Sequence, residues 1–304
     1  MTPGTDRTVG IALLCKDSLS DLMELRATLQ SFDEVIIADD GSTDGTVAYC
    51  RAQDYCLVDV SEIDSFGLKR LSAINAGRCA WMFMLDTDER LVDEDLRTRV
   101  DELVLVSPRD VSAWEVGFRT FFSGVELRHG GVYPLRVTRL FRRSDVTGYT
   151  GDVHERIRVG GRTLRSNLVL HHHSYRSVTH YISKINVYTT KEAHELLHNA
   201  MVITHTFPAR AFYRQMRHLL ATALRLRSIS SADFRAEAKA TLKNRYVVVP
   251  MLPLYPIARF LNIYLVKRGY RDGIAGVNYA SLSAIYSAVK YLKFVERRWM
   301  TSQT

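Results

Sequence analysis

The segment that most constrains the fold is residues 81–90, WMFMLDTDER, where a continuous apolar run ends on a cluster of acids. The apolar part is too short for a surface helix and has no polar face, so it predicts a buried strand. Asp86 and Asp88 follow at the carboxyl end of that strand. In an open α/β sheet, ligands bind in the crevice beyond the carboxyl ends of the strands, so both carboxylates are expected where chemistry takes place.

Two carboxylates so close together repel each other unless a cation lies between them. A hard divalent cation such as Mg²⁺ or Mn²⁺ prefers oxygen ligands and commonly shares them with a nucleotide diphosphate. Asp86 and Asp88 are therefore candidate metal ligands. The alternative is that Asp86 or Thr87 caps a following helix, which is expected to begin near Asp93.

The first 110 residues alternate strand and helix patterns. Strands are expected at residues 9–14, 34–38, 55–60 and 80–85, and helices at 19–29, 66–77 and in the segment that begins near Thr46. This order predicts an α/β fold with a parallel, doubly wound sheet. The acids of residues 39–40 and of residues 86–88 each end a strand, so we expect them to face one crevice.

A second candidate binding segment is DDGSTDGT, residues 39–46. Carboxylates such as Asp39 and Asp40 can accept hydrogen bonds from a nucleobase N–H or from ribose hydroxyls. Gly41 allows the backbone to turn tightly beside a ligand. The alternative is a simple turn in which Asp40 or Ser42 caps the next helix.

Charge is distributed unevenly along the chain. Of the 33 Asp and Glu, 22 lie before Val111, but only 11 of the 41 Lys and Arg do. An acidic part suited to a cation thus precedes a basic part suited to an anionic partner. Nucleic acid is not the expected partner, because no helix-turn-helix, zinc-finger or RNP-type pattern occurs. Within the acidic part, Lys69 and Arg70 are either diphosphate contacts or an ordinary solvated helix face.

The four cysteines all lie in the first 80 residues, on apolar strand or helix positions and without a C-x-x-C pair. This pattern predicts reduced core residues of a cytosolic protein. No secretory signal opens the sequence. The longest uncharged stretches, residues 246–258 and 274–289, are shorter than the roughly 18 residues that a membrane span needs, and none is expected.

After Asp110 the pattern changes to longer strands and then to helices. Strands are expected at residues 113–122, 135–141, 156–159 and 163–170, and helices at 178–199, 208–227, 232–246, 257–268 and 273–298. His171, His172 and His173 end the last strand. Alternation along a strand places His172 on the face of Leu168 and Leu170, and the other two histidines on the opposite face.

These motifs together carry a family resemblance. DEVIIADDGSTDGT, followed some forty residues later by FMLDTDE, resembles the nucleotide-sugar domain of family 2 glycosyltransferases, which have the GT-A fold. The resemblance implies that Asp39 and Asp40 bind the nucleotide, that Asp86 contacts it, and that Asp86 and Asp88 hold Mn²⁺ or Mg²⁺ at the diphosphate. The donor it implies is a nucleotide-sugar, with a UDP-sugar preferred, and the activity is that of a hexosyltransferase.

The second half extends this resemblance to the lipopolysaccharide core branch of the family. The matching segments are HGGVYPLRVTRLFRR, GDVHE, HHHSYRSVTHYISKINVYTTKEA and RFLNIYLVKRGYRDGIAGVNYASLSAIYSAVKYLKFVE. By resemblance Glu155 is the candidate catalytic base, with Asp152 as the alternative. The resemblance also makes His172 a further metal or diphosphate ligand. The alternative is that His172 is a solvated residue at the end of the strand. His154 contacts the diphosphate or orients Glu155. A base is needed because a sugar hydroxyl is a poor nucleophile.

The expected organisation is a GT-A catalytic domain at residues 1–175, with a nucleotide-sugar half (1–110) and an acceptor half (111–175), followed by a helical, basic lobe at 176–304. Cations and aromatic residues interleave in that lobe, which favours an anionic membrane surface over an ordinary packed lobe. The expected function is an inverting, metal-dependent transfer to a lipid-linked saccharide, at the cytoplasmic face of the cell membrane.

Three other readings remain open from the sequence. A protein or peptide could be the acceptor on the same fold. A catalytically silent, membrane-bound interaction protein is the second, although Asp86, Asp88 and Glu155 are retained together. The third is a zinc metalloprotease, because His194, Glu195 and His198 form a literal H-E-x-x-H. No close downstream carboxylate follows that motif to complete a zinc site, so it is the most distant alternative.

Overall fold

A computed structural model describes residues 7–91, 95–150, 156–199, 201–203, 246–248 and 252–301. The chain divides into two compact units. The first comprises Met1–Tyr181 with Val266–Val277, and the second comprises Ile182–Leu265 with Asn278–Thr304. The domain boundaries expected from the sequence stay a prediction.

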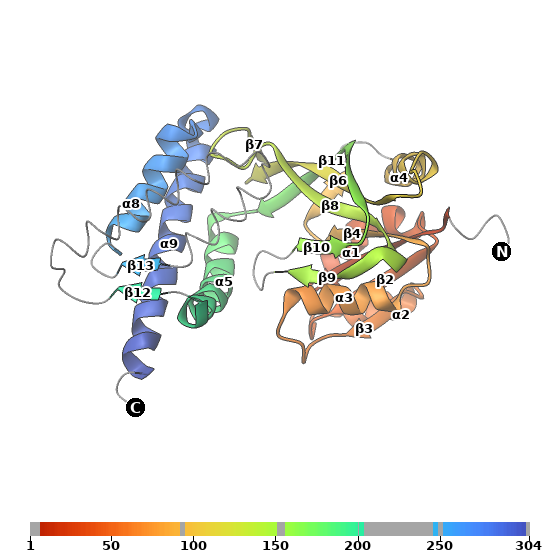
Figure 1. Cartoon of the computed structure of the whole chain (residues 1–304), viewed down its shortest axis with the longest axis horizontal. Helices are drawn as coiled ribbons and strands as arrows, with labels where there is room; N and C mark the ends of the chain where they lie inside the picture. The colour runs from red at the N-terminus through yellow and green to blue at the C-terminus, as the bar shows by residue number, and fades with distance from the viewer. Residues whose placement is uncertain are drawn as a thin grey trace. The chain divides into compact units, whose positions relative to one another are not determined.

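The first unit is built on one mixed sheet with the strand order β3-β2-β1-β4-β8-β6-β11-β5 and with β7 beside β6 (Figure 1). The strands of this sheet are β1 (Val9–Cys15), β2 (Glu34–Asp39), β3 (Cys56–Asp59), β4 (Trp81–Asp86), β5 (Glu89–Leu91), β6 (Val111–Phe122), β7 (Val125–Leu127), β8 (Leu135–Arg142) and β11 (Arg162–Tyr175). All but β5, β7 and β8 run in one direction. The four strands expected in the first 110 residues, β1 to β4, are parallel to one another, so the predicted α/β fold is confirmed, and the antiparallel β5, β7 and β8 make the whole sheet mostly parallel.

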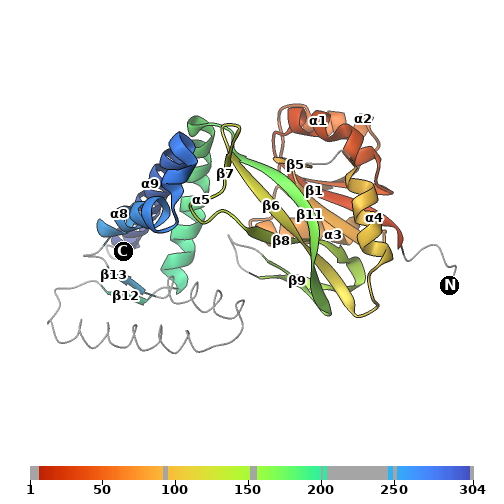
Figure 2. The ribbon, with the colours of Figure 1, turned by 90° about the horizontal axis from the view of Figure 1, so that it is seen from above.

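Both faces of the sheet are covered (Figure 2). The helices α1 (Leu19–Gln30), α2 (Thr46–Ala52) and α4 (Leu96–Leu105) contribute to the core on one face. On the other face lie α3 (Phe66–Ala76) and the antiparallel pair β9 (Val146–Thr150) and β10 (Arg156–Val159). A strand buried on both faces reads as a continuous apolar run, which is why β4 has no polar alternation.

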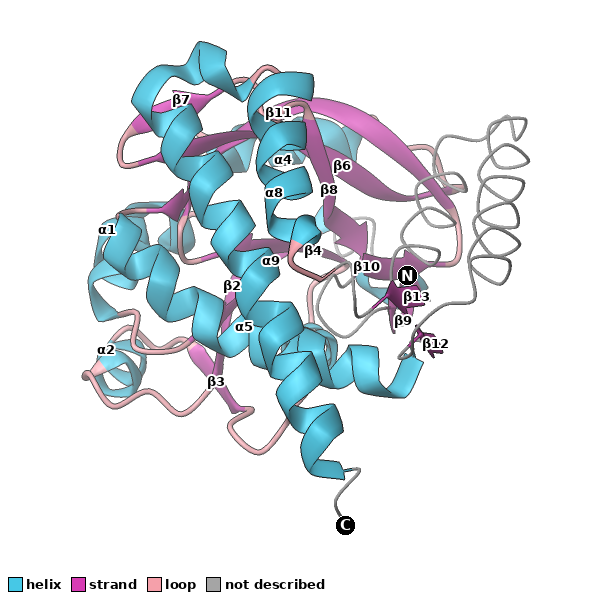
Figure 3. Ribbon diagram, turned by 90° about the vertical axis from the view of Figure 1, so that its left-hand side faces the viewer, coloured by secondary structure: helices cyan, strands magenta, loops and turns pink. Residues whose placement is uncertain are grey.

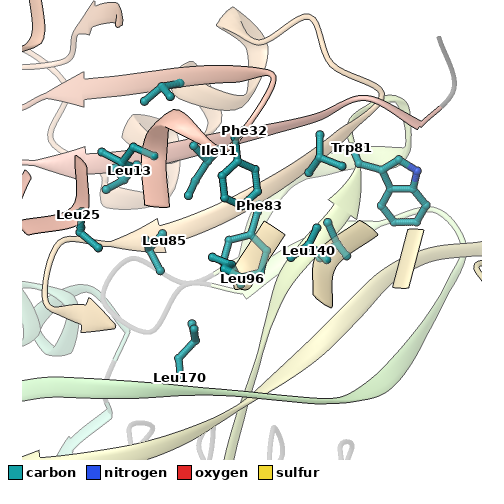
Figure 4. Packing of buried hydrophobic residues seen from close by; sticks show 14 of the residues in the cluster. Ile11, Leu13, Leu25, Phe32, Trp81, Phe83, Leu85, Leu96, Leu140 and Leu170 are labelled. Carbon is teal, nitrogen blue, oxygen red and sulfur yellow. The ribbon is translucent and has the colours of Figure 1, made fainter. Parts of the chain in front are cut away.

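Side chains of β4 alternate between the two cores. Trp81, Phe83 and Leu85 pack with Ile11 and Leu13 on the α1 side (Figure 4). Met82 and Met84 belong to the cluster on the α3 side. This anchoring holds the carboxyl end of β4 in place from both sides of the sheet.

The segment after β4 differs from the sequence expectation. Asp95, not Asp86 or Thr87, caps the next helix, since its side chain accepts a hydrogen bond from the Thr98 N–H at 2.9 Å. The short strand β5 intervenes and pairs with β11. The capping interpretation of Asp86 and Thr87 is therefore wrong.

The second unit contains most of α5 (Val178–Asn199), α8 (Leu254–Leu261) with the π-helical turn Asn262–Val266, most of α9 (Gly273–Thr301), and the parallel pair β12 (Met201–Ile203) and β13 (Tyr246–Val248) (Figure 3). Ala193 and Leu196 of α5 pack against Tyr291 and Phe294 of α9. The helix expected at 208–227 lies outside the described residues, as does that at 232–246 apart from Tyr246, which is in β13.

No helix in the described part of the chain combines the length and apolarity needed to cross a membrane. The four cysteines, Cys15, Cys50, Cys56 and Cys79, are free, and all except Cys56 are buried.

Candidate functional site

The acids of the two sequence motifs reach the same edge of the sheet. β1 pairs with β2 so that Cys15 lies opposite Asp39, and with β4 so that Leu14 lies opposite Asp86. Asp39 and Asp86 thus stand two strand spacings apart, about 10 Å, at the carboxyl edge. β6 and β11 run parallel to β4 and end at this edge too, so it gathers residues from five strands.

Asp39 shapes the turn that follows β2. Its Oδ2 accepts hydrogen bonds from the N–H groups of Gly41 (3.2 Å) and Ser42 (3.0 Å), and Gly41 has φ = 75°. The Asp39 side chain is buried. Burial of the neighbouring Cys15 thiol, and after it the charge of Asp39, raise the pKa of that thiol. These two hydrogen bonds fix the shape of the turn. Direct contact of Asp39 with a nucleotide stays a prediction.

The helix after this turn is capped differently from the sequence alternative. α2 begins at Thr46, whose N–H donates to Asp44 Oδ1 at 3.0 Å, and Ser42 instead accepts the Asp17 N–H. Asp40 forms an ion pair with Lys69. The interpretation of Asp40 or Ser42 as a helix cap is therefore wrong.

Helix α3 supplies two consecutive cations to the two acidic motifs. Lys69 is only 4% exposed and pairs with Asp40, while Arg70 Nη2 lies 3.1 Å from Asp86 Oδ1. Consecutive helical residues point about 100° apart, so one turn of α3 can serve both the β2 and the β4 ends. These residues are not a solvated helix face, and that alternative is wrong.

Arg139 of β8 completes the charge balance around Asp86. Its Nη2 lies 2.7 Å from Asp86 Oδ2 and also pairs with Glu89 Oε1, and Glu89 Oε2 accepts the Asp86 N–H at 3.0 Å. Burial opposes ionisation of Asp86, but Arg139 and then Arg70 outweigh it and hold its pKa well below the usual range. Burial and the Asp86 charge raise the pKa of Glu89 to about 7, against the opposing effect of Arg139.

Sequence reasoning missed Arg139 and Glu89. The available signal was an arginine inside the apolar strand pattern VTRLF, because a buried cation requires a carboxylate partner. The pairing of β8 with β4, which brings Arg139 to Asp86, joins residues more than fifty positions apart and has no local signature.

His172 lies beside the second aspartate because β5 pairs with β11. The register sets Glu89 opposite His172, and His172 Nε2 lies 3.4 Å from Asp88 Oδ1. The same nitrogen lies 2.7 Å from the Ser174 hydroxyl. Burial lowers the pKa of His172, but the Asp88 carboxylate outweighs it and the net shift is upward.

The predicted alternation of the three histidines is confirmed. His171 and His173 both lie against the Phe121 ring, with centroids 4.6 and 5.0 Å away. His172 faces the other way and packs against Phe118 at 5.7 Å.

A divalent cation fits part of this donor set. Both oxygens of Asp86 are engaged by arginines, which leaves Asp88 and His172 as the closest pair of predicted ligands. Among the described residues no three His, Cys, Asp or Glu side chains gather tightly enough to hold a metal by themselves. Mg²⁺ is typically held by one or two carboxylates together with substrate phosphates and water, so Asp88 and His172 suit an ion shared with a diphosphate.

Other predicted site residues lie outside what the structure describes. Glu155, Asp152 and His154 fall in residues 151–155. In the H-E-x-x-H motif His194 is exposed on α5, and the His198 side chain is not described. The zinc interpretation therefore gains no ligand cluster from the described residues.

The sheet order defines an α/β protein whose charged residues gather at the carboxyl edge of the sheet. Residues 15–105 match the family described as Glycosyl transferase family 2. This part of the chain, which holds both acidic motifs and both α3 cations, is a family 2 glycosyltransferase domain, and the family prediction is confirmed.

Similar proteins include the lipopolysaccharide core biosynthesis glycosyltransferase LpsC of Rhizobium meliloti (strain 1021). It is 29% identical over 135 residues, covering 43% of this chain and 49% of LpsC, so the chain spans about half the length of that relative. Among solved structures, the mannosyltransferase PcManGT of Pyrobaculum calidifontis, in complex with GDP-Man and Mn²⁺, has a TM-score of 0.47 at 15% identity over 94% of this chain and 86% of that chain. Glucosyl-3-phosphoglycerate synthase of Mycobacterium tuberculosis, with Mn²⁺ and UDP, has a TM-score of 0.35 at 15% identity, over 46% and 58%.

Proposed function

We propose that this protein is an inverting, metal-dependent glycosyltransferase that moves a sugar from a nucleotide-sugar, preferably a UDP-sugar, to a lipid-linked saccharide. The observation that carries the proposal is the ion pairing of Asp40 and Asp86, from two separate motifs, with consecutive cations of α3. A nucleotide diphosphate needs cations for its phosphates and acceptors for its nucleoside. The family 2 match over residues 15–105 supports this use of the edge.

The side chains at the carboxyl edge of the sheet suggest separate roles in binding phosphate, holding the metal and positioning Asp86. Lys69 and Arg70 can exchange their carboxylate partners for phosphate oxygens when a diphosphate enters. Asp88 and His172 would hold Mn²⁺ or Mg²⁺. When bound, that ion would stabilise the charge that develops on the departing diphosphate. Arg139 would keep Asp86 in place throughout, because it contacts Oδ2 of the carboxylate whereas Arg70 contacts Oδ1.

The acceptor hydroxyl requires a base on the face of the sugar opposite the diphosphate. Glu155 is our candidate, with Asp152 as the alternative. His154 would either contact the diphosphate or orient Glu155. In-line attack by the activated hydroxyl inverts the anomeric centre, with the proton passing to the carboxylate.

A lipid-linked acceptor and a peripheral membrane location are supported by α8. Leu254, Ile257, Leu261 and Leu265 recur at helical spacing and are 44–57% exposed, so α8 with its π-helical turn presents an apolar stripe. Lys267 and Arg268 follow directly in the sequence. An apolar stripe that is followed in the sequence by cations suits the interface of an anionic bilayer, here the cytoplasmic face of the cell membrane. The lipopolysaccharide core role in the name of LpsC points to the same class of acceptor.

The direct test is release of nucleoside diphosphate from a panel of UDP-, GDP-, ADP- and dTDP-sugars, with and without Mn²⁺ and an envelope glycolipid extract. We expect turnover of one nucleotide class, dependent on the metal, stimulated by the extract and lost in Asp88→Asn. Turnover stimulated only by a peptide library would instead assign a protein acceptor. Absence of turnover with every donor would overturn the proposal.

A further inference from the structure

The loop between β7 and β8, residues 128–134, carries a polar contact outside the acidic site, between His129 and Asp272. His129 Nδ1 lies 2.6 Å from Asp272 Oδ1, and the His129 backbone N–H donates to Asp272 Oδ2 at 2.8 Å. The Gly130 N–H donates to the Lys267 carbonyl at 2.9 Å. These three bonds tie the loop to residues 266–272, which belong to the same compact unit.

Asp272 determines which nitrogen of His129 can meet a ligand. The Asp272 side chain is only 5% exposed, whereas that of His129 is 30% exposed. Because the carboxylate accepts hydrogen bonds, Nδ1 carries the proton, and the neutral ring then has its lone pair on Nε2. Among the described residues Nε2 has no hydrogen-bond partner. The pair therefore presents a fixed acceptor atom that suits a hydroxyl group.

The loop stands at the edge that holds the acidic site. β8 runs antiparallel to β4 with Leu140 opposite Phe83. β8 also runs antiparallel to β6, with its first residue, Leu135, opposite Phe118, four residues before the carboxyl end of β6. The loop that precedes Leu135 therefore leaves the sheet at its carboxyl edge, beside the segment that carries the acids.

Two exposed tyrosines lie on the tied segments. Tyr133, in the loop, is 53% exposed, and Tyr270, two residues before Asp272, is 47% exposed. A tyrosine offers an apolar ring face and a hydroxyl at low entropic cost, which suits the alternating C–H and O–H surface of a sugar ring. The two segments thus combine aromatic surface with a directed hydrogen-bond acceptor.

We propose that His129, held by Asp272, and Tyr133 form a saccharide-binding site for the acceptor, with His129 Nε2 accepting a hydrogen bond from an acceptor hydroxyl. This inference rests on the proposed glycosyltransferase function. It assigns acceptor binding to residues that are separate from the acids and cations of the donor site.

Two variants of His129 distinguish acceptor binding through Nε2 from stabilisation of the loop through the Nδ1 bond to Asp272. His129→Asn keeps an N–H near the Nδ1 position, and so the bond to Asp272, but removes Nε2. His129→Gln keeps a polar group near the Nε2 position and loses the bond at Nδ1. The readouts are the thermal midpoint, the Kd for UDP with Mn²⁺, and the KM for envelope glycolipid in transfer from the radiolabelled nucleotide-sugar.

We expect His129→Asn to keep the thermal midpoint and nucleotide binding of the wild type, and to raise the acceptor KM about tenfold, as loss of one hydrogen bond does. Tyr133→Ala should raise the same KM, with Tyr133→Phe recovering most of the loss. A wild-type acceptor KM in His129→Asn, together with a raised KM or a lowered thermal midpoint in His129→Gln, would show that the His129–Asp272 pair only stabilises the loop. That result would overturn the inference. If the wild type neither binds nor turns over any nucleotide-sugar, the proposed function fails first, and the inference with it.

Discussion

Replacing Arg139 with methionine tests whether the buried charge network organises the acidic site. The Arg139 side chain is 9% exposed and pairs with Asp86 and with Glu89, which is fully buried. Removing one partner of a buried ion pair typically costs about 3–5 kcal/mol of unfolding free energy, because the other charge is left uncompensated. Asp86 keeps Arg70.

The raised pKa of Glu89 indicates where in that range the loss of unfolding free energy should lie. Burial already raises the pKa of this carboxyl and Arg139 opposes that rise, so loss of Arg139 makes it easier for Glu89 to take up a proton. We therefore expect Arg139→Met to lose about 3 kcal/mol, the lower end of the range. The double variant Arg139→Met/Glu89→Gln should recover part of this loss, because it leaves no second carboxyl to neutralise.

Urea unfolding followed by tryptophan fluorescence measures this loss. A Trp299→Phe background confines the signal to Trp81 and Trp114, which both lie in the first unit. The matched control is Arg136→Met, an exposed arginine on the same strand, for which we expect less than about 1 kcal/mol. An Arg139→Met loss no larger than that of the control would refute the reasoning.

Three further variants test local features of the first unit. Arg119 lowers the pKa of Glu126 to about 2, from the ordinary value of 4.5. The pair therefore stabilises the fold above pH 4.5, and this contribution is lost as the pH falls towards 2. The difference in unfolding free energy between the wild type and Glu126→Gln should accordingly disappear between pH 4.5 and pH 2, as measured by urea unfolding at a series of pH values. Gly41→Ala should cost about 1–2 kcal/mol because φ is +75°, and an unchanged unfolding midpoint would contradict that backbone conformation. Asp95→Ala should cost about 1 kcal/mol through loss of the α4 cap, seen as a lower thermal midpoint.

The sequence predicted those parts of the site that depend on local pattern. The apolar run ending at Asp86 identified β4 and its carboxyl edge, and strand alternation placed His172 apart from His171 and His173. The strand β5 was missed because three residues carry no periodicity, and its existence depends on pairing with β11.

Long-range pairing explains the other omissions. Arg139 reaches Asp86 through the β8–β4 pairing, and His129 reaches Asp272 across more than 140 residues. Neither contact has a local signal, because each depends on which strands and loops become neighbours in the finished fold. Lys69 and Arg70 were recognised as candidates, but only the ion pairs with the two motifs distinguish them from a solvated helix face.

The central claim is that the carboxyl edge binds a nucleotide diphosphate together with a divalent cation at Asp88 and His172. Calorimetric titration of UDP, GDP, ADP and dTDP, with and without Mn²⁺, on the wild type and Asp88→Asn tests it most directly. The account predicts metal-dependent binding of one nucleotide that is lost in Asp88→Asn, while the fold is retained. Binding that is equally tight without metal, or unchanged in the variant, would contradict the assigned metal site, and no binding of any nucleotide would contradict the central claim itself.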